Sequence, residues 1–378
     1  MVLLHVPAWD QSHKALSLRA TSSSKSQPKK QPVSQPPITY RDAGVNIDAQ
    51  DEALAQSKQA IRSTFNPGVI SDVGLFGGLF DPARMGCGGQ ILVASADGVG
   101  TKLDVAKRAK IYNTVGADLV NHCINDILVQ GAKPLFFMDY VGTGKLEPDV
   151  VAGLITGCAE ACRAAGVALL GGETAEMPGL YAAGDFDLVG FIVGAVAHDK
   201  VLDGKAVAAG QKLLGISSSG LHTNGYSLAR KVLFERMGLG LEDKPEALEG
   251  RSVQEALLAP HRSYLELLWP LLEEDRLVAM AHITGGGLLD NLPRVLGQHD
   301  AIVDPGSWER PGLFRMLVEG AGIDRDEAHR AFNMGLGMVL IVNSEEEEAV
   351  RSHLEGAGEA VFALGELVAG KGQVRWSD

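Results

Sequence analysis

Long apolar runs and cysteine are scarce in this sequence. No apolar run reaches the ~18 residues that a membrane-spanning helix needs, which argues against a membrane protein. Cys158 and Cys162 are four residues apart in a helical pattern, and without a histidine at ligand spacing they predict a buried helix face rather than a metal pair. A disulfide framework is not expected from only four cysteines, Cys87, Cys123, Cys158 and Cys162. We therefore expect a soluble protein of a reducing compartment, the cytoplasm.

Positive charge and the common nucleotide-binding motifs are also in short supply. The formal net charge is −13, and so acidic a surface argues against nucleic acid or a membrane as a partner. A phosphorylated substrate would need local positive charge or Mg²⁺ to offset this field. Neither the G-x-x-x-x-G-K-[ST] loop nor the G-x-G-x-x-G turn occurs. Any nucleotide must therefore be held by loops of another kind.

The first 37 residues differ in composition from the rest. They contain five basic residues and one acid, Asp10, so their net charge is +4 and the remainder carries −13 − 4 = −17. The run SSSKSQPKKQPVSQPP offers no amphipathic face, and we expect this segment to be disordered. Its serine-rich, acid-poor composition is compatible with a transit peptide for a plastid or mitochondrion. The low arginine content slightly favours the alternative, a dispensable extension.

The length of 378 residues favours two domains, because a single core of this size is unusual. Strand-like apolar runs alternate with helical patterns in the first half, and the 46 glycines fall mostly in short clusters after such runs. Residues 200–210 are turn-rich, and a second half then opens with the strand KLLGIS. The expected fold class is α/β, with an N-terminal domain over 38–205 and a C-terminal α/β domain over 206–378.

The stretch ILVASADGVGTK, residues 91–102, is the strongest candidate for a binding site. Its apolar run predicts a buried strand that ends in Asp97, and a glycine-spaced turn then leads to Thr101 and Lys102. A carboxylate can hold Mg²⁺, while backbone N–H groups and an ammonium can hold phosphate. Taken alone, the stretch is equally compatible with an ordinary turn between a strand and a helix.

Other segments have a similar character. The helical pattern of 116–130 places Asp126 near the edge of its apolar face, and VALLGGETAEMPG puts Glu173 after a strand and paired glycines. SDVGLFGGLFD alternates glycines with large apolar residues, so it either closes over a ligand or forms a hairpin. In the second half, SSSGLHTNGYS precedes a helix, and AHITGGGLLDNLPRVL has the order strand, glycine loop, helix. A polar glycine loop ahead of a helix is a candidate site for phosphate or hydroxyl groups.

Taken together and in order, these segments resemble one known family. RDAGVNID, SADGVGTKL, INDILVQGAKPLFFMDY, LLGGETAEMPG, SSSGLHTNGYSL, HITGGGLLDNLPRVL and FNMGLGM are similar to segments of the phosphoribosylformylglycinamidine cyclo-ligases, also called AIR synthetases. The resemblance extends from about Ile38 to the C-terminus. One departure lies in the glycine-rich segment, where many members have a denser run of glycines and this chain has Leu75.

The resemblance implies an enzyme of de novo purine synthesis. Such an enzyme converts formylglycinamidine ribonucleotide (FGAM) and ATP into aminoimidazole ribonucleotide (AIR), ADP and phosphate, and requires Mg²⁺. The resemblance also implies a two-domain, PurM-like subunit whose N-terminal domains form most of the ATP site and pair through their sheets in a homodimer. Whether a monovalent cation assists is left open.

The resemblance also implies roles for particular residues. ATP phosphorylates the formyl amide oxygen in this family, and an amidine nitrogen then closes the ring as phosphate leaves. Asp97, Asp126 and Glu173 would hold Mg²⁺, and Lys102 would offset charge on the transferring phosphoryl group. The ATP site would also include Gly74, Gly77, Gly78, Gly98, Val99, Gly100, Thr101, Asn125, Gly172 and Thr174. The substrate site would comprise Ser219, His222, Asn224, Gly285, Gly286 and Gly287.

Two alternatives stay open at this point. His222 is a candidate general base for ring closure, or a structural residue that caps the following helix. The chain as a whole would otherwise be another ATP-using enzyme of the same superfamily, or a nucleotide-binding regulator without catalysis. A selenophosphate synthetase would need a reactive cysteine near its start, but no cysteine precedes Cys87. A thiamine-monophosphate kinase usually shows paired aspartates in place of DGVGTK.

Overall fold

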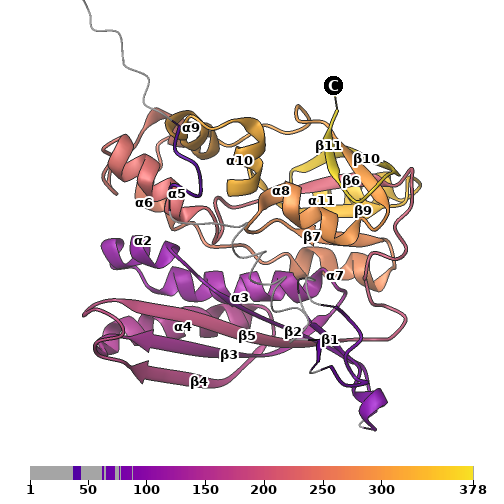
Figure 1. The fold of residues 1–378 in the computed structure, drawn as a ribbon, viewed down its shortest axis with the longest axis horizontal. Coiled ribbons are helices and arrows are strands. Elements are labelled where there is room, and N and C mark those ends of the chain that lie inside the picture. Colours follow the sequence, from indigo (N-terminus) through magenta and orange to yellow (C-terminus); the bar gives the residue numbers. More distant parts are fainter. Residues whose placement is uncertain are drawn as a thin grey trace, which may run out of the picture. The chain divides into compact units, whose positions relative to one another are not determined.

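The computed structural model describes residues 37–43, 62–63, 65–72, 76, 78–86 and 88–377. These residues form two β-sheets with helices packed against them (Figure 1). The expected extension 1–37, apart from Pro37, and the candidate ATP-binding residues Gly74 and Gly77 lie outside the described residues. In the described part of the chain, no helix is long and apolar enough to cross a membrane.

The first sheet has five strands and belongs to the N-terminal half. Its strand order is β1-β2-β5-β3-β4, and β3 and β4 form its parallel pair. Helix α4 (Pro148–Ala164) connects these two strands, because parallel neighbours need a crossover connection. The strands are β1 (Gly78–Phe80), β2 (Ile91–Gly98), β3 (Lys133–Thr143), β4 (Ala168–Glu176) and β5 (Phe186–Val196).

Helix α3 (Asn113–Leu128) packs on this sheet through an apolar stripe at helical spacing. Leu119, Ile124 and Ile127 are fully buried in that stripe. Gly116 allows α3 to approach α4 closely, since a Cβ at this position would lie 2.2 Å from the carbonyl oxygen of Leu154. The other side of α3 carries buried polar residues that contact the second half of the chain.

The second sheet has six strands in the order β11-β8-β10-β6-β9-β7. It is mixed, because β11 runs parallel to β8 while the other pairs are antiparallel. Every residue of β9 is buried, as its continuous apolar sequence predicts. The strands are β6 (Lys212–Ser217), β7 (Ala279–His282), β8 (His299–Val303), β9 (Leu336–Val342), β10 (Val361–Ala369) and β11 (Val374–Trp376).

The remaining helices are short and belong mostly to the second half. They are α2 (Lys102–Ala109), α5 (Tyr226–Arg230), α6 (Val253–Leu257), α7 (Leu265–Glu273), α8 (Gly287–Asn291), α9 (Gly312–Ala321), α10 (Arg325–Ala331) and α11 (Glu347–Gly356). Three 3₁₀ turns cover Pro82–Met85, Glu246–Leu248 and Leu292–Val295, and a π-helical turn covers Lys231–Arg236. Residues 197–211 connect the last strand of the first sheet to the first strand of the second.

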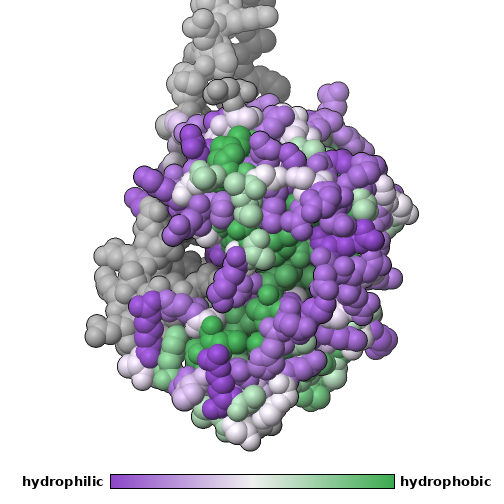
Figure 2. Space-filling model, turned by 90° about the vertical axis from the view of Figure 1, so that its right-hand side faces the viewer, coloured by the Kyte–Doolittle hydropathy of each residue, from purple (hydrophilic) through white to green (hydrophobic). Residues whose placement is uncertain are grey.

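The face of the first sheet opposite α3 is apolar and exposed. Phe137 and Ile192 are register partners buried on the helix side, so their neighbours Met138 and Phe191 point to the other face. Met138 and Phe191 are 41% and 42% exposed, and Leu170 on β4 is 64% exposed. Hydrophobic side chains also form a band on the side of the molecule shown in Figure 2.

Candidate active site

Polar side chains from both halves of the chain gather around the buried polar side of α3. We call six of them the histidine–aspartate cluster. Its members are Asp97 at the end of β2, His122 and Asp126 one turn apart on α3, His222 in the loop after β6, His261 in the loop before α7, and His282 at the end of β7.

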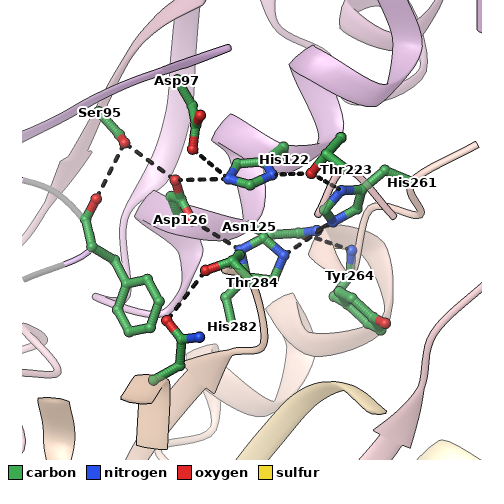
Figure 3. A network of polar contacts seen from close by, with 12 residues as sticks. Ser95, Asp97, His122, Asn125, Asp126, Thr223, His261, Tyr264, His282 and Thr284 are labelled. Atoms are coloured by element: carbon green, nitrogen blue, oxygen red, sulfur yellow. Dashed lines mark hydrogen bonds and ion pairs between the residues drawn. The ribbon is translucent and has the colours of Figure 1, made fainter. Parts of the chain in front are cut away.

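His122 links the two acids that the sequence predicted at this site. Its Nε2 lies 2.6 Å from Oδ2 of Asp97 and 3.5 Å from Oδ2 of Asp126, and its Nδ1 lies 2.7 Å from the Thr223 hydroxyl (Figure 3). Burial alone would lower the pKa of His122, but the carboxylates of Asp97 and Asp126 raise it to about 9. Burial would likewise raise the pKa of Asp97, and the charge of His122 instead brings it below its usual value. At neutral pH the site therefore holds a cation between two carboxylates.

The other three histidines continue this network into the second half. Nδ1 of His282 lies 2.8 Å from Oδ1 of Asp126, and Nε2 of His282 lies 3.0 Å from Nε2 of His261 (Figure 3). The His261 ring is stacked on that of His222, with centroids 3.9 Å apart. Burial brings the pKa of both His222 and His261 well below the ordinary value, so these rings are neutral. The cluster thus combines one charged imidazole with neutral ones that can donate or accept single hydrogen bonds.

Lys102 does not take the position predicted for it. Its side chain is fully buried, and Nζ lies 2.7 Å from Oδ2 of Asp118. Nζ also donates hydrogen bonds to the carbonyl oxygens of His222 and Ala259, at 3.0 and 2.9 Å. Because three protein oxygens surround the buried ammonium, Lys102 cannot contact a phosphoryl group in this structure, and the prediction of direct charge compensation is wrong for it. Lys102 instead ties α2 to two loops of the second half.

More of the backbone N–H groups in the turn after β2 are bonded within the protein than predicted. The N–H of Gly98 donates to Oδ1 of Asp97 at 2.6 Å, and the N–H of Val99 donates to the carbonyl of Leu188 at 3.2 Å. Two of the expected phosphate donors are therefore already used within the protein. Gly100, with a φ of 67°, and the exposed Thr101 complete the turn and stay candidates for contact with a nucleotide.

Asn125 was expected to contact ATP, but it serves the packing of the two halves. It is fully buried, and its Oδ1 accepts a hydrogen bond from the N–H of Tyr264 at 2.9 Å. Its Nδ2 donates to the carbonyl of Arg262 at 2.9 Å and lies 3.2 Å from Nε2 of His261. The hydrogen bonds of Oδ1 and of one Nδ2 hydrogen are thus made within the protein.

Glu173 does not join the two aspartates within one chain. Asp97 is paired across the sheet with Gly190, Gly190 with Asp139, and Asp139 with Gly172. Three steps between neighbouring strands amount to roughly 14 Å. Glu173 is exposed on the edge strand β4, next to the half-buried Thr174, so the prediction that Glu173 shares a metal ion with Asp97 is wrong for the single subunit.

Strand packing, and not ligand binding, explains the glycine at position 172, next to Glu173. A Cβ at this position would lie 2.2 Å from the carbonyl oxygen of Asp139 on the adjacent strand. Only glycine therefore allows β4 to pair with β3 at this point.

The two glycine loops of the second half lie next to each other. Nδ2 of Asn224 lies 3.2 Å from the position that a Cβ of residue 285 would occupy. Oδ1 of Asn224 is buried and has no hydrogen-bond donor in the described part of the chain. A buried acceptor without a donor is costly unless a ligand supplies one, which makes Asn224 a good ligand-binding residue. The Ser219 hydroxyl, by contrast, already donates to the carbonyl of Pro260 at 2.5 Å.

His222 is held as a hydrogen-bond donor. Its backbone is in the left-handed region, with a φ of 60°, and its Nε2 accepts a hydrogen bond from the N–H of Ser219 at 3.1 Å. In a neutral ring Nδ1 then carries the hydrogen, and Nδ1 is buried without a partner among the described residues. A general base needs a free lone pair, so this arrangement does not support that role. The helix-capping alternative also fails, because Gly225 occupies the N-cap of α5 and the His222 ring is bonded to the N–H of Ser219 instead.

The described part of the glycine-rich segment lies beside the cluster. The Ser95 hydroxyl donates to the carbonyl of Phe76 at 3.2 Å and lies 3.3 Å from Oδ2 of Asp126 (Figure 3). The guanidinium of Arg294 stacks over the Phe76 ring at 4.6 Å. Gly78 is the exposed first residue of β1, next to this contact. The described part of the segment has the features of the hairpin alternative, because β1 pairs antiparallel with β2 and Phe76 and Leu79 are buried in the core. Closure of the segment over a ligand stays a prediction.

Sequence reasoning missed three of the six cluster residues, His122, His261 and His282. Each is a histidine within an apolar or small-residue context, and nothing in the local pattern distinguishes it from a surface histidine. His282 had the clearest signal, because it follows a buried strand and precedes the glycine triplet, in the same position that Asp97 has before DGVG.

Both halves of the chain match models of one protein family. Residues 80–196 match the AIR synthase related protein N-terminal domain, and residues 208–377 match the corresponding C-terminal domain. The chain belongs to the AIR synthase related family. It is 48% identical to a phosphoribosylformylglycinamidine cyclo-ligase of Trichlorobacter lovleyi, over 89% of this chain and 96% of the relative. It is 49% identical to the cyclo-ligase of Geobacter sulfurreducens, over 87% of this chain and 95% of the relative.

Solved structures with the same fold include more distant enzymes. This AIR synthase related chain superposes on thiamine-monophosphate kinase from Stenotrophomonas maltophilia with a TM-score of 0.60 and 20% identity, over 86% of this chain and 96% of the other. The hydrogenase maturation protein HypE in complex with ATP superposes with a TM-score of 0.56 and 18% identity, over 88% and 92%. At these identities the likeness concerns the two-sheet α/β fold alone.

Proposed function

We propose that this AIR synthase related chain catalyses the ATP-dependent closure of FGAM to AIR in de novo purine biosynthesis. The observation that carries the proposal is the 48% identity to the Trichlorobacter lovleyi cyclo-ligase over 89% of this chain. At that coverage the likeness includes the loops of both halves that form the histidine–aspartate cluster. An assignment based on the fold alone would not separate a cyclo-ligase from a kinase.

The reaction first phosphorylates the formyl amide oxygen of FGAM and then releases that oxygen as part of phosphate. The γ-phosphoryl group of ATP is transferred to the formyl amide oxygen of FGAM, the amide N–H proton is lost, and ADP departs. An amidine nitrogen then attacks the activated carbon, the carbon–oxygen bond breaks, and phosphate leaves with the former amide oxygen. Proton loss completes the imidazole. Catalysis of such steps rests mainly on positioning and on neutralising phosphate charge.

Asp97 and Asp126 would hold the Mg²⁺ ion. Both carboxylates face the same side of the site, where Nε2 of His122 lies 2.6 and 3.5 Å from them. Mg²⁺ is held in proteins by one or two carboxylates together with water and phosphate oxygens. When bound, the ion would neutralise charge on the ATP phosphates. His122 supplies positive charge at the same point, which is the role first predicted for Lys102.

The second half would bind FGAM through its two glycine loops. Asn224 Oδ1 would accept a hydrogen bond from an N–H or O–H group of the substrate, and His222 Nδ1 would donate one. Both atoms are buried and lack partners among the described residues, so a ligand would satisfy one donor and one acceptor together. Gly285 would let the backbone approach the substrate closely, whereas Gly287 packs against α10.

We also propose that two copies pair through the exposed face of the first sheet. Leu92, Met138, Leu170 and Phe191 present apolar surface there, and exposed apolar patches on that scale mark interaction sites. Residues 38–205 would thus bind ATP and pair, while 206–378 bind the substrate. Pairing would place two edge strands close to each other, so Glu173 is a candidate to act across the interface.

The test is a product assay with purified protein, ATP, MgCl₂ and FGAM, in which AIR is detected by diazo coupling. Asp97→Asn should abolish turnover, because it removes one of two charges that face the cation. Asp275→Asn is the matched control, since this exposed carboxylate pairs with Lys200 and is not part of the histidine–aspartate cluster. A wild-type protein that binds a non-hydrolysable ATP analogue but forms no AIR would refute the proposal and favour a nucleotide-binding regulator.

A further inference from the structure

A second cavity lies in the C-terminal half, on the far side of α10 from the substrate loops. It has a volume of about 740 Å³, which is in the range of small-molecule sites. Its walls come from α9, from α10 and from the loop between β8 and α9. Its lining includes Trp308, Arg310, Arg315, Val318, Arg325 and His329, together with the acids Glu309 and Glu319.

One wall of this cavity carries positive charge that the protein does not fully balance. Arg310 stacks over the Trp308 ring at 4.1 Å, and no carboxylate of the described residues lies within ion-pair distance of it. Its hydrogen bonds go to the carbonyls of Pro305 and Trp308. Partial burial and the nearby charge of Arg325 both lower the pKa of Arg310. Such a guanidinium is stabilised by an incoming anion, and in a chain of net charge −13 a site of this kind is unusual.

The cavity lining also contains a buried hydrogen-bond acceptor that has no donor. His329 is 2% exposed, and its Nδ1 donates to the carbonyl of Arg325 at 2.7 Å. Burial lowers the pKa of His329 to about 4, so the ring is neutral and its Nε2 carries a lone pair. This Nε2 has no partner among the described residues. The ring stands edge-on to Trp308 and Trp376, with centroids 5.9 and 4.6 Å away.

We propose that this cavity binds a small nucleotide, whose phosphate pairs with Arg310 and Arg325 and whose base donates an N–H hydrogen bond to His329. Trp308 contacts both polar groups, because Arg310 lies over its ring and His329 stands edge-on to it. The apolar residues Val318 and Met334 belong to the same lining. A ligand must therefore combine an anion, a flat apolar body and an N–H donor. Inorganic phosphate lacks the last two features, and a free nucleoside lacks the first.

The back of α10 connects this cavity to the substrate loops. A Cβ on Gly287 would lie 1.8 Å from the carbonyl oxygen of His329, so the glycine triplet packs directly against the helix. Gly225 also packs against the end of this helix, because its Cβ would lie 2.8 Å from the carbonyl oxygen of Ala331. A ligand that draws on His329 and Arg325 therefore acts on a helix that supports both loops. This coupling rests on the proposed function, whereas binding itself does not.

Tryptophan fluorescence can test binding in the full chain. Replacing Trp9 and Trp269 by phenylalanine leaves two emitting tryptophans: Trp308, which lines the cavity, and Trp376, whose ring contacts that of His329. AMP is titrated in the presence of a saturating non-hydrolysable ATP analogue, which occupies the catalytic nucleotide site. We expect a saturable change in emission, with at least tenfold weaker binding after Arg310→Gln or His329→Leu. Arg315→Gln is the control, because Arg315 is already paired with Glu309.

Each of the following results would overturn a stated part of the proposal. Emission that does not respond to AMP, or that responds equally in the Arg310→Gln and His329→Leu variants, overturns the site. Loss of the response when the ATP analogue is present shows that AMP was in the catalytic site, which also overturns it. A response to inorganic phosphate at the same concentrations overturns the nucleotide as ligand class. The coupling to the substrate loops is overturned if saturating AMP leaves the KM for FGAM unchanged in the wild type, while binding is still seen.

Discussion

The buried pair of Lys102 and Asp118 allows a sharp test of how the two halves are held together. Lys102→Met would remove the ammonium and leave the Asp118 carboxylate fully buried without its counter-charge. Removing one partner of a buried ion pair typically costs about 3–5 kcal/mol. We therefore expect the free energy of unfolding to fall by that amount, and the midpoint of thermal unfolding to fall by several degrees, measured by calorimetry.

A second substitution isolates the cause of this loss. Asp118→Asn, added to Lys102→Met, removes the uncompensated charge but keeps Oδ1 as the acceptor for the N–H of His261, 2.6 Å away. The double variant should recover most of the lost stability. Lys107→Met on the same helix is the matched control, because Lys107 and Asp185 form an exposed pair that is worth at most about 1 kcal/mol.

Activity should not recover with stability. Both variants lose the hydrogen bonds from Nζ to the carbonyls of His222 and Ala259. A displacement of about 1 Å in these loops would lower kcat by roughly 10²-fold, even where the fold is intact. If Lys102→Met loses activity but is as stable as the Lys107→Met control, Lys102 contacts the substrate directly and the positioning role is refuted.

Three further predictions concern other parts of the molecule. The folded-state pKa of His122, about 9, is above the ordinary histidine value of 6.5. The charged His122 therefore contributes its full stabilisation below pH 6.5 and loses it as the pH rises through 9. The difference in unfolding midpoint between the wild type and His122→Asn should shrink over that window, and a constant difference would contradict the raised pKa. A chain that begins at Pro37 should keep full activity in the AIR assay. A chain that begins at residue 44 should lose activity, because it lacks the hydrogen bonds of Tyr40 to Gly225 and Glu327. Equal activities would show that residues 37–43 are dispensable. Phe191→Asp should convert a dimer to a monomer in light scattering, because it buries a charge in the proposed interface, and an unchanged mass would place the interface elsewhere.

The sequence predicted the parts of the site that follow from local pattern. Asp97 stands at the end of a buried strand, and Asp126 lies at the edge of a helical apolar stripe, so period and position placed both side chains near a common rim. The meeting of Asn224 with the glycine triplet followed from two loops of the same kind in the same half.

The parts that it missed depend on long-range packing. Lys102 is the first residue of α2, and only the docking of the second half decides that its ammonium is enclosed. Glu173 follows the same strand-then-acid pattern as Asp97, but the strand order puts it on the edge of the sheet. His122, His261 and His282 come from three distant segments, and no pattern within a window of sequence can show that their rings meet.

The contacts of Lys102 and Asp118 also bear on how the protein folds, unfolds and is cleaved by proteases. The first half on its own would leave this pair without the two carbonyl acceptors and the His261 N–H that the second half supplies. Two buried charges cannot be enclosed cheaply in a partly assembled chain. The halves that appear as separate domains along the sequence should therefore unfold in one cooperative transition, and a protease cut in the 197–211 connection should not release a stable fragment.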